Sequence, residues 1–229
     1  MDSTVLSKIK GGLIVSCQAL EDEPLHSPYI MQRMAVAAMW GGAVGIRANT
    51  VPDICKIKEE VDLPIIGILK RMYKDSEVYI TPTMREVDEL MGVKPDIIAL
   101  DSTDRLHPNG QSLQEFFGEA RKKYPDQLFM ADCSTVEEGM RAVELGFDIV
   151  GTTMHGYTPY TKGSLLPDFD MIEEMVKRTD RPVIAEGGIW TPEQLKRILD
   201  CGVLAAVVGT AITRPMVITR RFTSVIQNK

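Results

Sequence analysis

The sequence lacks long hydrophobic runs, blocks of basic residues and any signal-peptide pattern. None of its apolar stretches reaches the ~18 residues that a membrane-spanning helix needs. The formal net charge is −6 and lysine and arginine do not cluster, which argues against nucleic-acid binding but allows a small anionic ligand. The short apolar stretch at residues 11–18 has no small-residue cleavage site behind it, so we interpret it as the first strand of a cytoplasmic protein.

Cysteine and histidine are also scarce. The four cysteines are widely spaced and form no C-x-x-C pair, which favours free thiols in a reducing compartment over disulfides or a metal site. The three histidines lie far apart, without an H-x-H or H-E-x-x-H pair. The sequence therefore predicts no metal site, and we interpret His155, which follows a predicted strand, as a solvated loop histidine, with a substrate contact as the alternative.

Short apolar runs alternate with amphipathic segments of helical length. The runs are GLIVSCQ, AVGIRA, PIIGILK, DIIALDS, LFMADCS, DIVGTTM, PVIAEGG and AAVVGTA. Continuous apolar runs are typical of parallel strands buried on both faces, and the helices between them supply the crossovers. No linker-like stretch divides the chain. We predict one (β/α)8 TIM-barrel domain over residues 1–229 with an eight-stranded parallel sheet, and a doubly wound open sheet is the alternative.

A polar residue or a glycine ends each apolar run. In strand order these residues are Gln18, Arg47, Lys70, Asp101, Asp132, Thr152, Glu186 and Gly209. Any one of them could simply begin a loop. The active site of a TIM barrel lies at the C-terminal ends of its strands, however, so mixed charges at these positions would converge on one mouth. The pattern favours a catalytic site over a purely structural barrel.

Lys70 and Glu186 end the third and seventh predicted strands and should face each other across the mouth. A lysine among apolar neighbours, or beside a cation such as Arg47, can lose its proton and act as a base. A carboxyl group opposite could protonate the other face of a planar intermediate, and the pair could thus invert a carbon without a cofactor. A Lys–Glu ion pair that supports a loop is the structural alternative, and spacing does not separate the two.

Glycines follow the last two predicted strands, in AEGG (185–188) and VGTA (208–211). Turns at these places in TIM barrels often bind phosphate, because glycine lets backbone amides approach an anion and a helix N-terminus adds a favourable potential. Arg214 could add a charge-assisted contact. Tight turns alone would explain either pair of glycines, but their occurrence at both places favours a phosphate site.

The segment after Lys70, residues 71–90, is the longest non-apolar stretch that precedes a predicted helix. It is long enough to act as a lid, and a packed surface loop explains it equally well. Tyr73 and Tyr79 are its expected aromatic anchors in either case.

With these features in place, the sequence resembles the bacterial N-acetylmannosamine-6-phosphate 2-epimerases over essentially its whole length. The matching stretches are VSCQAL, GIRAN, PIIGILKRMY with VYITPT, DIIALDST, MADCST, GTTMHGYT, VIAEGG with TPEQ, and VVGTAITRP. The resemblance implies a (β/α)8 isomerase that interconverts N-acetylmannosamine 6-phosphate and N-acetylglucosamine 6-phosphate in sialic-acid and amino-sugar catabolism, without a cofactor or metal.

The resemblance also implies a role for each matching residue. Lys70 would move the proton at carbon 2, with Glu186 as the partner acid or base. The residues implied to position the sugar and its acetamido group are Gln18, Arg47 and Asp132. The groups implied to hold the 6-phosphate are backbone amides near Gly188, Gly209 and Thr210, together with Arg214.

Two positions depart from the family pattern. His155 stands in GTT-x-x-GYT where a small residue such as serine is expected, and Gly188 stands where relatives often carry a larger or basic side chain. Each departure could alter contacts with the sugar or the phosphate. Two other functions fit the scaffold: an aldolase that uses Lys70 as a Schiff-base lysine, and a phosphosugar sensor. A sensor has no need for both Lys70 and Glu186.

The last predicted helix has more apolar residues than one helical stripe needs. They are Met216, Val217, Ile218, Phe222, Val225 and Ile226. Packing on the barrel would account for them, and a homodimer contact through this helix is the other explanation.

Overall fold

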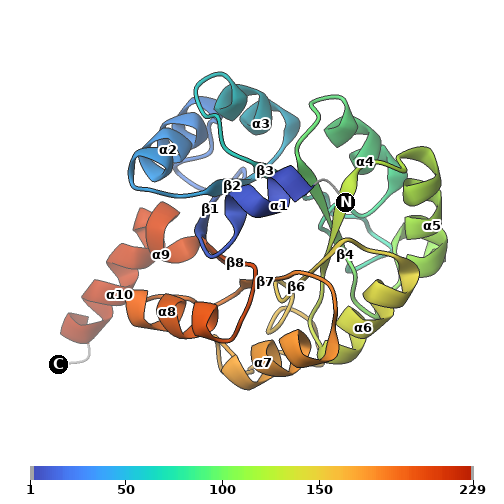
Figure 1. Ribbon diagram of the computed structural model, residues 1–229. Coiled ribbons are helices and arrows are strands. Elements are labelled where there is room, and N and C mark those ends of the chain that lie inside the picture. Colours follow the sequence, from blue (N-terminus) through green and yellow to red (C-terminus); the bar gives the residue numbers. More distant parts are fainter. Residues whose placement is uncertain (1–2, 228–229) are drawn as a thin grey trace.

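Each predicted strand is present, and the strands close into a parallel barrel in chain order (Figure 1). The computed structural model describes residues 3–227. The strands are β1 (Leu13–Cys17), β2 (Gly45–Asn49), β3 (Ile65–Ile68), β4 (Ile97–Asp101), β5 (Leu128–Asp132), β6 (Ile149–Gly151), β7 (Val183–Glu186) and β8 (Ala205–Val208). β8 pairs with β1 in parallel, with Ala206 opposite Leu13, which closes the sheet. The TIM-barrel prediction is confirmed and the open sheet is wrong.

Helices surround the barrel, and those predicted from amphipathic segments are present. They are α2 (Pro28–Trp40), α3 (Val51–Lys58), α4 (Met84–Met91), α5 (Leu113–Lys123), α6 (Val136–Leu145), α7 (Phe169–Arg178) and α8 (Pro192–Asp200), followed by α9 (Thr210–Thr213) and α10 (Pro215–Gln227). A 3-10 turn, η1, spans Pro108–Gly110. Capping boxes begin α4, α5, α6 and α8, which explains why these helices start where the sequence places a serine or threonine.

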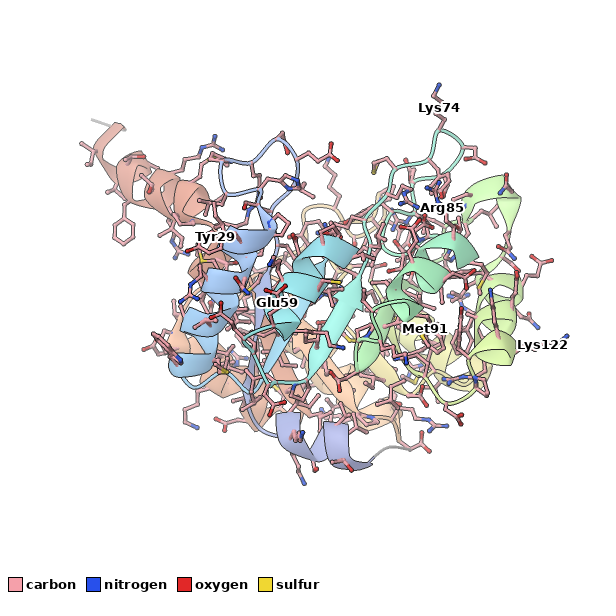
Figure 2. The ribbon with its side chains drawn as sticks, turned by 90° about the horizontal axis from the view of Figure 1, so that it is seen from above. Tyr29, Glu59, Lys74, Arg85, Met91 and Lys122 are labelled. Carbon is pink, nitrogen blue, oxygen red and sulfur yellow. The ribbon has the colours of Figure 1, made fainter. Side chains whose placement is uncertain are left out.

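A short N-terminal helix that the sequence pattern did not indicate covers one end of the barrel. This helix, α1 (Ser3–Ile9), inserts Ile9 into the apolar cluster inside the barrel, where the side chain is 1% exposed. In Figure 2, α1 lies at the end opposite the loop that carries Lys74. The strand C-termini, and therefore the candidate site, lie at the end that α1 leaves open.

Alternate side chains along each strand point into the barrel, and they change from apolar to acidic at the C-terminal ends of the strands. Ala99, Met130 and Ile184 belong to the buried apolar cluster that fills the barrel. Because side chains two residues apart face the same side of a strand, the next interior positions on these strands are Asp101, Asp132 and Glu186. A charged layer therefore lies directly on the apolar layers at the C-terminal end.

The last helix, α10, extends beyond the ring of barrel helices (Figure 1). Phe222, Val225 and Ile226 are 71%, 73% and 66% exposed, so packing on the barrel does not account for them. The structural explanation expected from the sequence is wrong for these three side chains. Among the helices of residues 3–227, none is long and apolar enough to cross a membrane.

Candidate active site

A buried arginine joins two acidic residues at the centre of the mouth. Arg47, on β2, is 1% exposed, and its Nη2 lies 2.5 Å from Oδ2 of Asp132, while its Nη1 lies 3.2 Å from Oδ1. The same Nη1 lies 3.3 Å from Oε2 of Glu186. Burial disfavours the charged guanidinium, but the charges of Asp132 and Glu186 outweigh this effect and raise the pKa of Arg47 above its ordinary value. The guanidinium therefore stays cationic, and three predicted site residues form one cluster.

Lys70 follows β3 and adds a second basic side chain to this cluster. Its backbone N–H donates to Oδ1 of Asn49 at 2.9 Å, and its backbone bridges to Ile80. Within residues 3–227, the ammonium group forms no hydrogen bond or salt bridge. Burial and then the Arg47 charge lower the pKa of Lys70 from 10.5 to about 8, although Glu186 and Asp132 oppose the shift. An amine with a lowered pKa can act as a base near neutral pH.

Glu186, at the end of β7, completes the predicted pair without pairing to Lys70. Its salt bridge is with Arg47, so the alternative of a loop-supporting Lys70–Glu186 ion pair is not what the structure shows in the described part of the chain. Burial raises the pKa of the Glu186 carboxyl, although Arg47 and Lys70 act in the opposite direction. A carboxyl group with a raised pKa can carry and deliver a proton near neutral pH.

Thr153 is a site residue that the sequence analysis missed. Its hydroxyl lies 2.6 Å from Oδ1 of Asp132 and 3.3 Å from Oε2 of Glu186, so it links the two acids. Thr152, the predicted member of the mouth, instead bonds the backbone N–H and C=O of Glu186. The prediction for Thr152 was wrong by one residue. Counting interior positions from Ile149 in steps of two would have selected Thr153.

Asp101, at the end of β4, is fully buried and has its own partners. Its carboxylate accepts hydrogen bonds from the Thr103 hydroxyl at 2.7 Å and from Nη2 of Arg105 at 2.7 Å. Burial raises the pKa of Asp101 to about 6, against the charge of Arg105. Because its oxygens are already engaged, Asp101 supports the wall of the site.

Gln18 follows β1 at the side of the mouth nearest β8. Its side-chain N–H donates to Oγ of Ser16 at 2.8 Å. Its amide oxygen is buried and has no hydrogen-bond partner among the described residues. An unpaired buried acceptor is costly, so a ligand hydroxyl or N–H at this position would relieve the cost.

The two glycine turns lie on neighbouring strands, β7 and β8. Gly187 and Gly188 have positive φ values of 121° and 68°, and Gly209 is the N-cap of α9. In the described part of the chain, the backbone N–H groups of Gly188, Gly209 and Thr210 donate to no protein acceptor. Unpaired backbone amides of this kind can bind an anion, and the phosphate site stays a prediction.

The side chains of Arg214 and His155 each contact acidic or carbonyl groups of the protein. Arg214, the C-cap of α9, forms an ion pair with Glu23 of the β1–α2 loop and borders the same cavity as Gln18. The Nδ1 atom of His155 lies 2.7 Å from the Ser134 carbonyl, and its Nε2 lies 3.2 Å from Oδ2 of Asp168. His155 thus lies between the β5–α6 loop and the N-cap of α7, and because it is buried, the expectation of a solvated loop histidine is wrong.

The first part of the segment after Lys70, residues 71–80, is a packed hairpin, whereas its last residues, from Met84, belong to α4, so the loop expected over residues 71–90 was too long. The hairpin has antiparallel bridges at Lys70–Ile80 and Tyr73–Ser76. Side chains fasten it to the β4–α5 loop, because Oγ of Ser76 donates to the Leu106 carbonyl at 2.7 Å and Arg105 donates to the Glu77 carbonyl at 2.9 Å. Of the two expectations for this segment, the structure supports the packed loop.

The described residues contain no group of three or more histidine, cysteine, aspartate or glutamate side chains that could hold a metal ion. The cysteines of residues 3–227 are free thiols, of which Cys17 and Cys133 are buried. Burial raises the pKa of both buried thiols, so neither is a ready nucleophile.

Comparison with known proteins decides the family. A family model described as "Putative N-acetylmannosamine-6-phosphate epimerase" matches residues 31–228. A relative from Enterobacter sp. (strain 638), named "Putative N-acetylmannosamine-6-phosphate 2-epimerase", is 56% identical over 226 residues, which cover 98% of this chain and 96% of the relative. A relative of the same name from Clostridium perfringens (strain SM101 / Type A) is 56% identical over 97% of this chain and 100% of its own length. The chain belongs to this epimerase family.

Solved structures agree with the family assignment. A structure described as the N-acetylmannosamine-6-phosphate 2-epimerase from Clostridium perfringens has a TM-score of 0.93 and 56% identity, over 98% of this chain and 97% of that one. A thiamine phosphate pyrophosphorylase from Pyrococcus furiosus has a TM-score of 0.62 at 18% identity and shares the fold alone. The motifs on which the epimerase resemblance was based therefore identified the family correctly.

The Gly188 turn of this epimerase-family chain allows a test with a matched control. A Cβ at Gly188 would clash with Leu166, whose carbonyl carbon would lie 2.9 Å away, whereas a Cβ at Gly110 meets no atom within 4 Å. The φ values are 68° and 69°, so both alanine variants carry similar backbone strain of about 1 kcal/mol. We expect Gly188→Ala to cost about 1–3 kcal/mol more than Gly110→Ala because of the overpacking.

Thermal unfolding measures this difference, since 1 kcal/mol corresponds to about 2–4 °C in a domain of this size. Equal melting temperatures for the two variants would show that the turn rearranges freely and that Leu166 does not restrict position 188.

Proposed function

We propose that this chain interconverts N-acetylmannosamine 6-phosphate and N-acetylglucosamine 6-phosphate by removing and returning the proton at carbon 2. The observation that carries the proposal is the placement of Lys70, with its lowered pKa, beside a buried arginine that also holds Glu186. The identity of 56% to relatives named as 2-epimerases supports the substrate.

Proton removal begins from the open-chain sugar. The carbon 2 proton is acidic only when carbon 1 is an aldehyde, so the ring opens first. The neutral amine of Lys70 then takes this proton, and an enediolate-like intermediate forms. Its negative charge develops near Arg47, whose fixed guanidinium needs little reorganisation to stabilise it.

Proton return on the opposite face inverts carbon 2. Glu186 is the acid for this step, either directly or through a substrate hydroxyl, because its carboxyl lies in the same cluster and its pKa is raised by burial. Thr153 and Arg47 hold the carboxyl in place. Only protons are transferred, so the steps need no redox cofactor.

The remaining predicted residues bind the substrate. Gln18 offers an unpaired amide oxygen to the sugar, and Asp132 fixes Arg47 beside it. The free amides near Gly188, Gly209 and Thr210 hold the 6-phosphate. Arg214 contributes positive charge from the adjacent cavity wall, where Glu23 holds its guanidinium.

The function is tested by following N-acetylmannosamine 6-phosphate in deuterium oxide by proton NMR, with a chelator present. We expect N-acetylglucosamine 6-phosphate to appear with deuterium at carbon 2, because the Glu186 carboxyl that returns the proton exchanges its own proton with solvent. Failure to form this product would refute the proposed substrate.

Lys70→Ala is the matched variant for the same assay. Loss of a general base should lower the rate about 100- to 10,000-fold, while the backbone amides still bind the phosphate. Isothermal titration with N-acetylmannosamine 6-phosphate checks that binding survives. Normal turnover by Lys70→Ala would show that Lys70 is not the base.

The lowered pKa of Lys70 predicts the pH dependence of the reaction. At pH 7, a lysine with a pKa of about 8 is neutral in roughly one molecule in ten, against about one in 3,000 at the ordinary value of 10.5. The base form of Lys70 increases as the pH rises, so Lys70 contributes an almost tenfold increase in kcat/KM per unit from about pH 6.5 to about pH 8, and where Glu186 donates directly, loss of its proton opposes this increase. A profile that falls throughout about pH 6.5–8 would contradict the assignment.

We further propose that α10 forms a homodimer contact. Its exposed Phe222, Val225 and Ile226 make an apolar surface that has no partner among residues 3–227, and a second copy supplies a chemically matched one. Sedimentation equilibrium should give twice the chain mass of 25.5 kDa for the wild type and the monomer mass for Phe222→Asp. Leu165→Asp, at a loop residue that is 86% exposed, is the control and should stay dimeric. A monomeric wild type would refute the contact.

A further inference from the structure

Tyr79 lies at the mouth of the barrel on the returning arm of the hairpin that Lys70 begins. The backbone N–H of Arg71 donates to the Tyr79 carbonyl at 3.0 Å, and the neighbouring residue, Ile80, bridges to Lys70. The bond from Arg105 to the Glu77 carbonyl fastens the same arm to the β4–α5 loop. The backbone of Tyr79 is therefore held beside Lys70.

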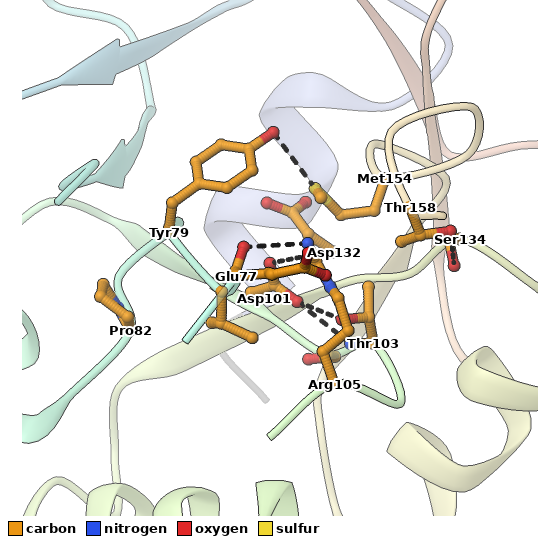
Figure 3. A network of polar contacts seen from close by, with 12 residues as sticks. Glu77, Tyr79, Pro82, Asp101, Thr103, Arg105, Asp132, Ser134, Met154 and Thr158 are labelled. Atoms are coloured by element: carbon orange, nitrogen blue, oxygen red, sulfur yellow. Dashed lines mark hydrogen bonds and ion pairs between the residues drawn. The ribbon is translucent and has the colours of Figure 1, made fainter. Parts of the chain in front are cut away.

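The phenol points across the mouth to the loop after β6, as Figure 3 shows. Its hydroxyl lies 3.9 Å from the sulfur of Met154, and within residues 3–227 it has no other hydrogen-bond partner. A thioether is a weak acceptor. The half-buried hydroxyl is thus a donor that the protein leaves almost unused, and a stronger acceptor could replace the sulfur at little cost.

The surroundings keep this hydroxyl protonated. Burial and the charge of Asp101 raise the pKa of Tyr79 to about 12, Arg105 opposes the shift, and Asp132 adds to it. The phenol also interacts electrostatically with Arg47, which places it on the same cluster as the proposed proton-transfer groups. At neutral pH, Tyr79 is an uncharged donor beside a charged site.

An uncharged donor suits one group of the substrate better than the others. The developing enediolate has Arg47 to stabilise it, and the phosphate has the glycine turns. The acylamino group is attached to carbon 2, the atom that Lys70 must reach, and Tyr79 lies on the hairpin strand paired with Lys70. Its carbonyl oxygen is a neutral acceptor that is much stronger than a thioether.

Resting on the proposed function, the geometry points to Tyr79 as a residue that selects for 2-acylamino sugars, its hydroxyl donating a hydrogen bond to the carbonyl oxygen of the substrate's N-acyl group. In the structure, the same hydroxyl donates to the Met154 sulfur, and the substrate carbonyl would replace this acceptor. The contact forms in the ground state and persists through proton transfer, so it contributes mainly to binding.

Tyr79→Phe tests the assignment by removing only the hydroxyl. We expect the KM for N-acetylmannosamine 6-phosphate to rise about three- to tenfold, the effect of one neutral hydrogen bond, with kcat nearly unchanged. Mannose 6-phosphate has a hydroxyl in place of the N-acyl group, so its inhibition constant should not change. Tyr73→Phe, in the same hairpin, is the control, because the Tyr73 hydroxyl donates to Glu86 at 3.0 Å and should affect neither constant.

An unchanged KM in Tyr79→Phe, or an equal loss of affinity for mannose 6-phosphate, would overturn the inference. Melting temperatures of both phenylalanine variants confirm that they are folded. If the wild type does not epimerise N-acetylmannosamine 6-phosphate, the proposed function fails, and calorimetric binding of the two sugar phosphates to wild type and Tyr79→Phe still decides N-acyl recognition separately.

Discussion

The buried guanidinium of Arg47 is the interaction on which the site depends. It lies at hydrogen-bond distance from Asp132 and within salt-bridge distance of Glu186, in a place where its own side chain is 1% exposed. Burying several charged groups is costly, and close hydrogen-bonded geometry must offset that cost. Without Arg47, two acids would share one desolvated pocket, and their pKa values would rise until at least one was neutral. The charge state of the mouth follows from this one side chain.

The same cation makes Lys70 usable as a base. Burial and Arg47 lower the pKa of Lys70, whereas Glu186 and Asp132 raise it, and the balance is a value of about 8. If the two carboxylates faced Lys70 without the guanidinium between them, they would hold the lysine protonated. Because Arg47 pairs with both acids, the lysine remains without an ion-pair partner in the described residues. One buried charge thus sets the electrostatic environment of both Lys70 and Glu186, as the proposed proton transfers require.

The sequence pattern predicted the barrel and most of the cluster because both depend on local signals. Continuous apolar runs show strands that are buried on both faces, and each run ends at the side chain that reaches the mouth. Arg47, Lys70, Asp132 and Glu186 are found this way. The miss at β6 has the same basis: the strand is only three residues long, so its end does not show which threonine faces inward, and the two-residue period from Ile149 selects Thr153.

Other features depend on contacts between distant parts of the chain and have no local signal. The ion pair of Arg214 with Glu23 joins residues 191 positions apart, so the sequence could place Arg214 near a phosphate turn but could not show what holds it. Tyr79 is similar. Its place in the sequence indicates an aromatic residue in a loop, and only the bridge of Ile80 to Lys70 shows that this loop doubles back onto Lys70. A phenol that is nine residues from Lys70 in the chain therefore lies on the adjacent arm of the hairpin. In the proposed reaction, the hairpin thereby couples the choice of substrate to the position of the base.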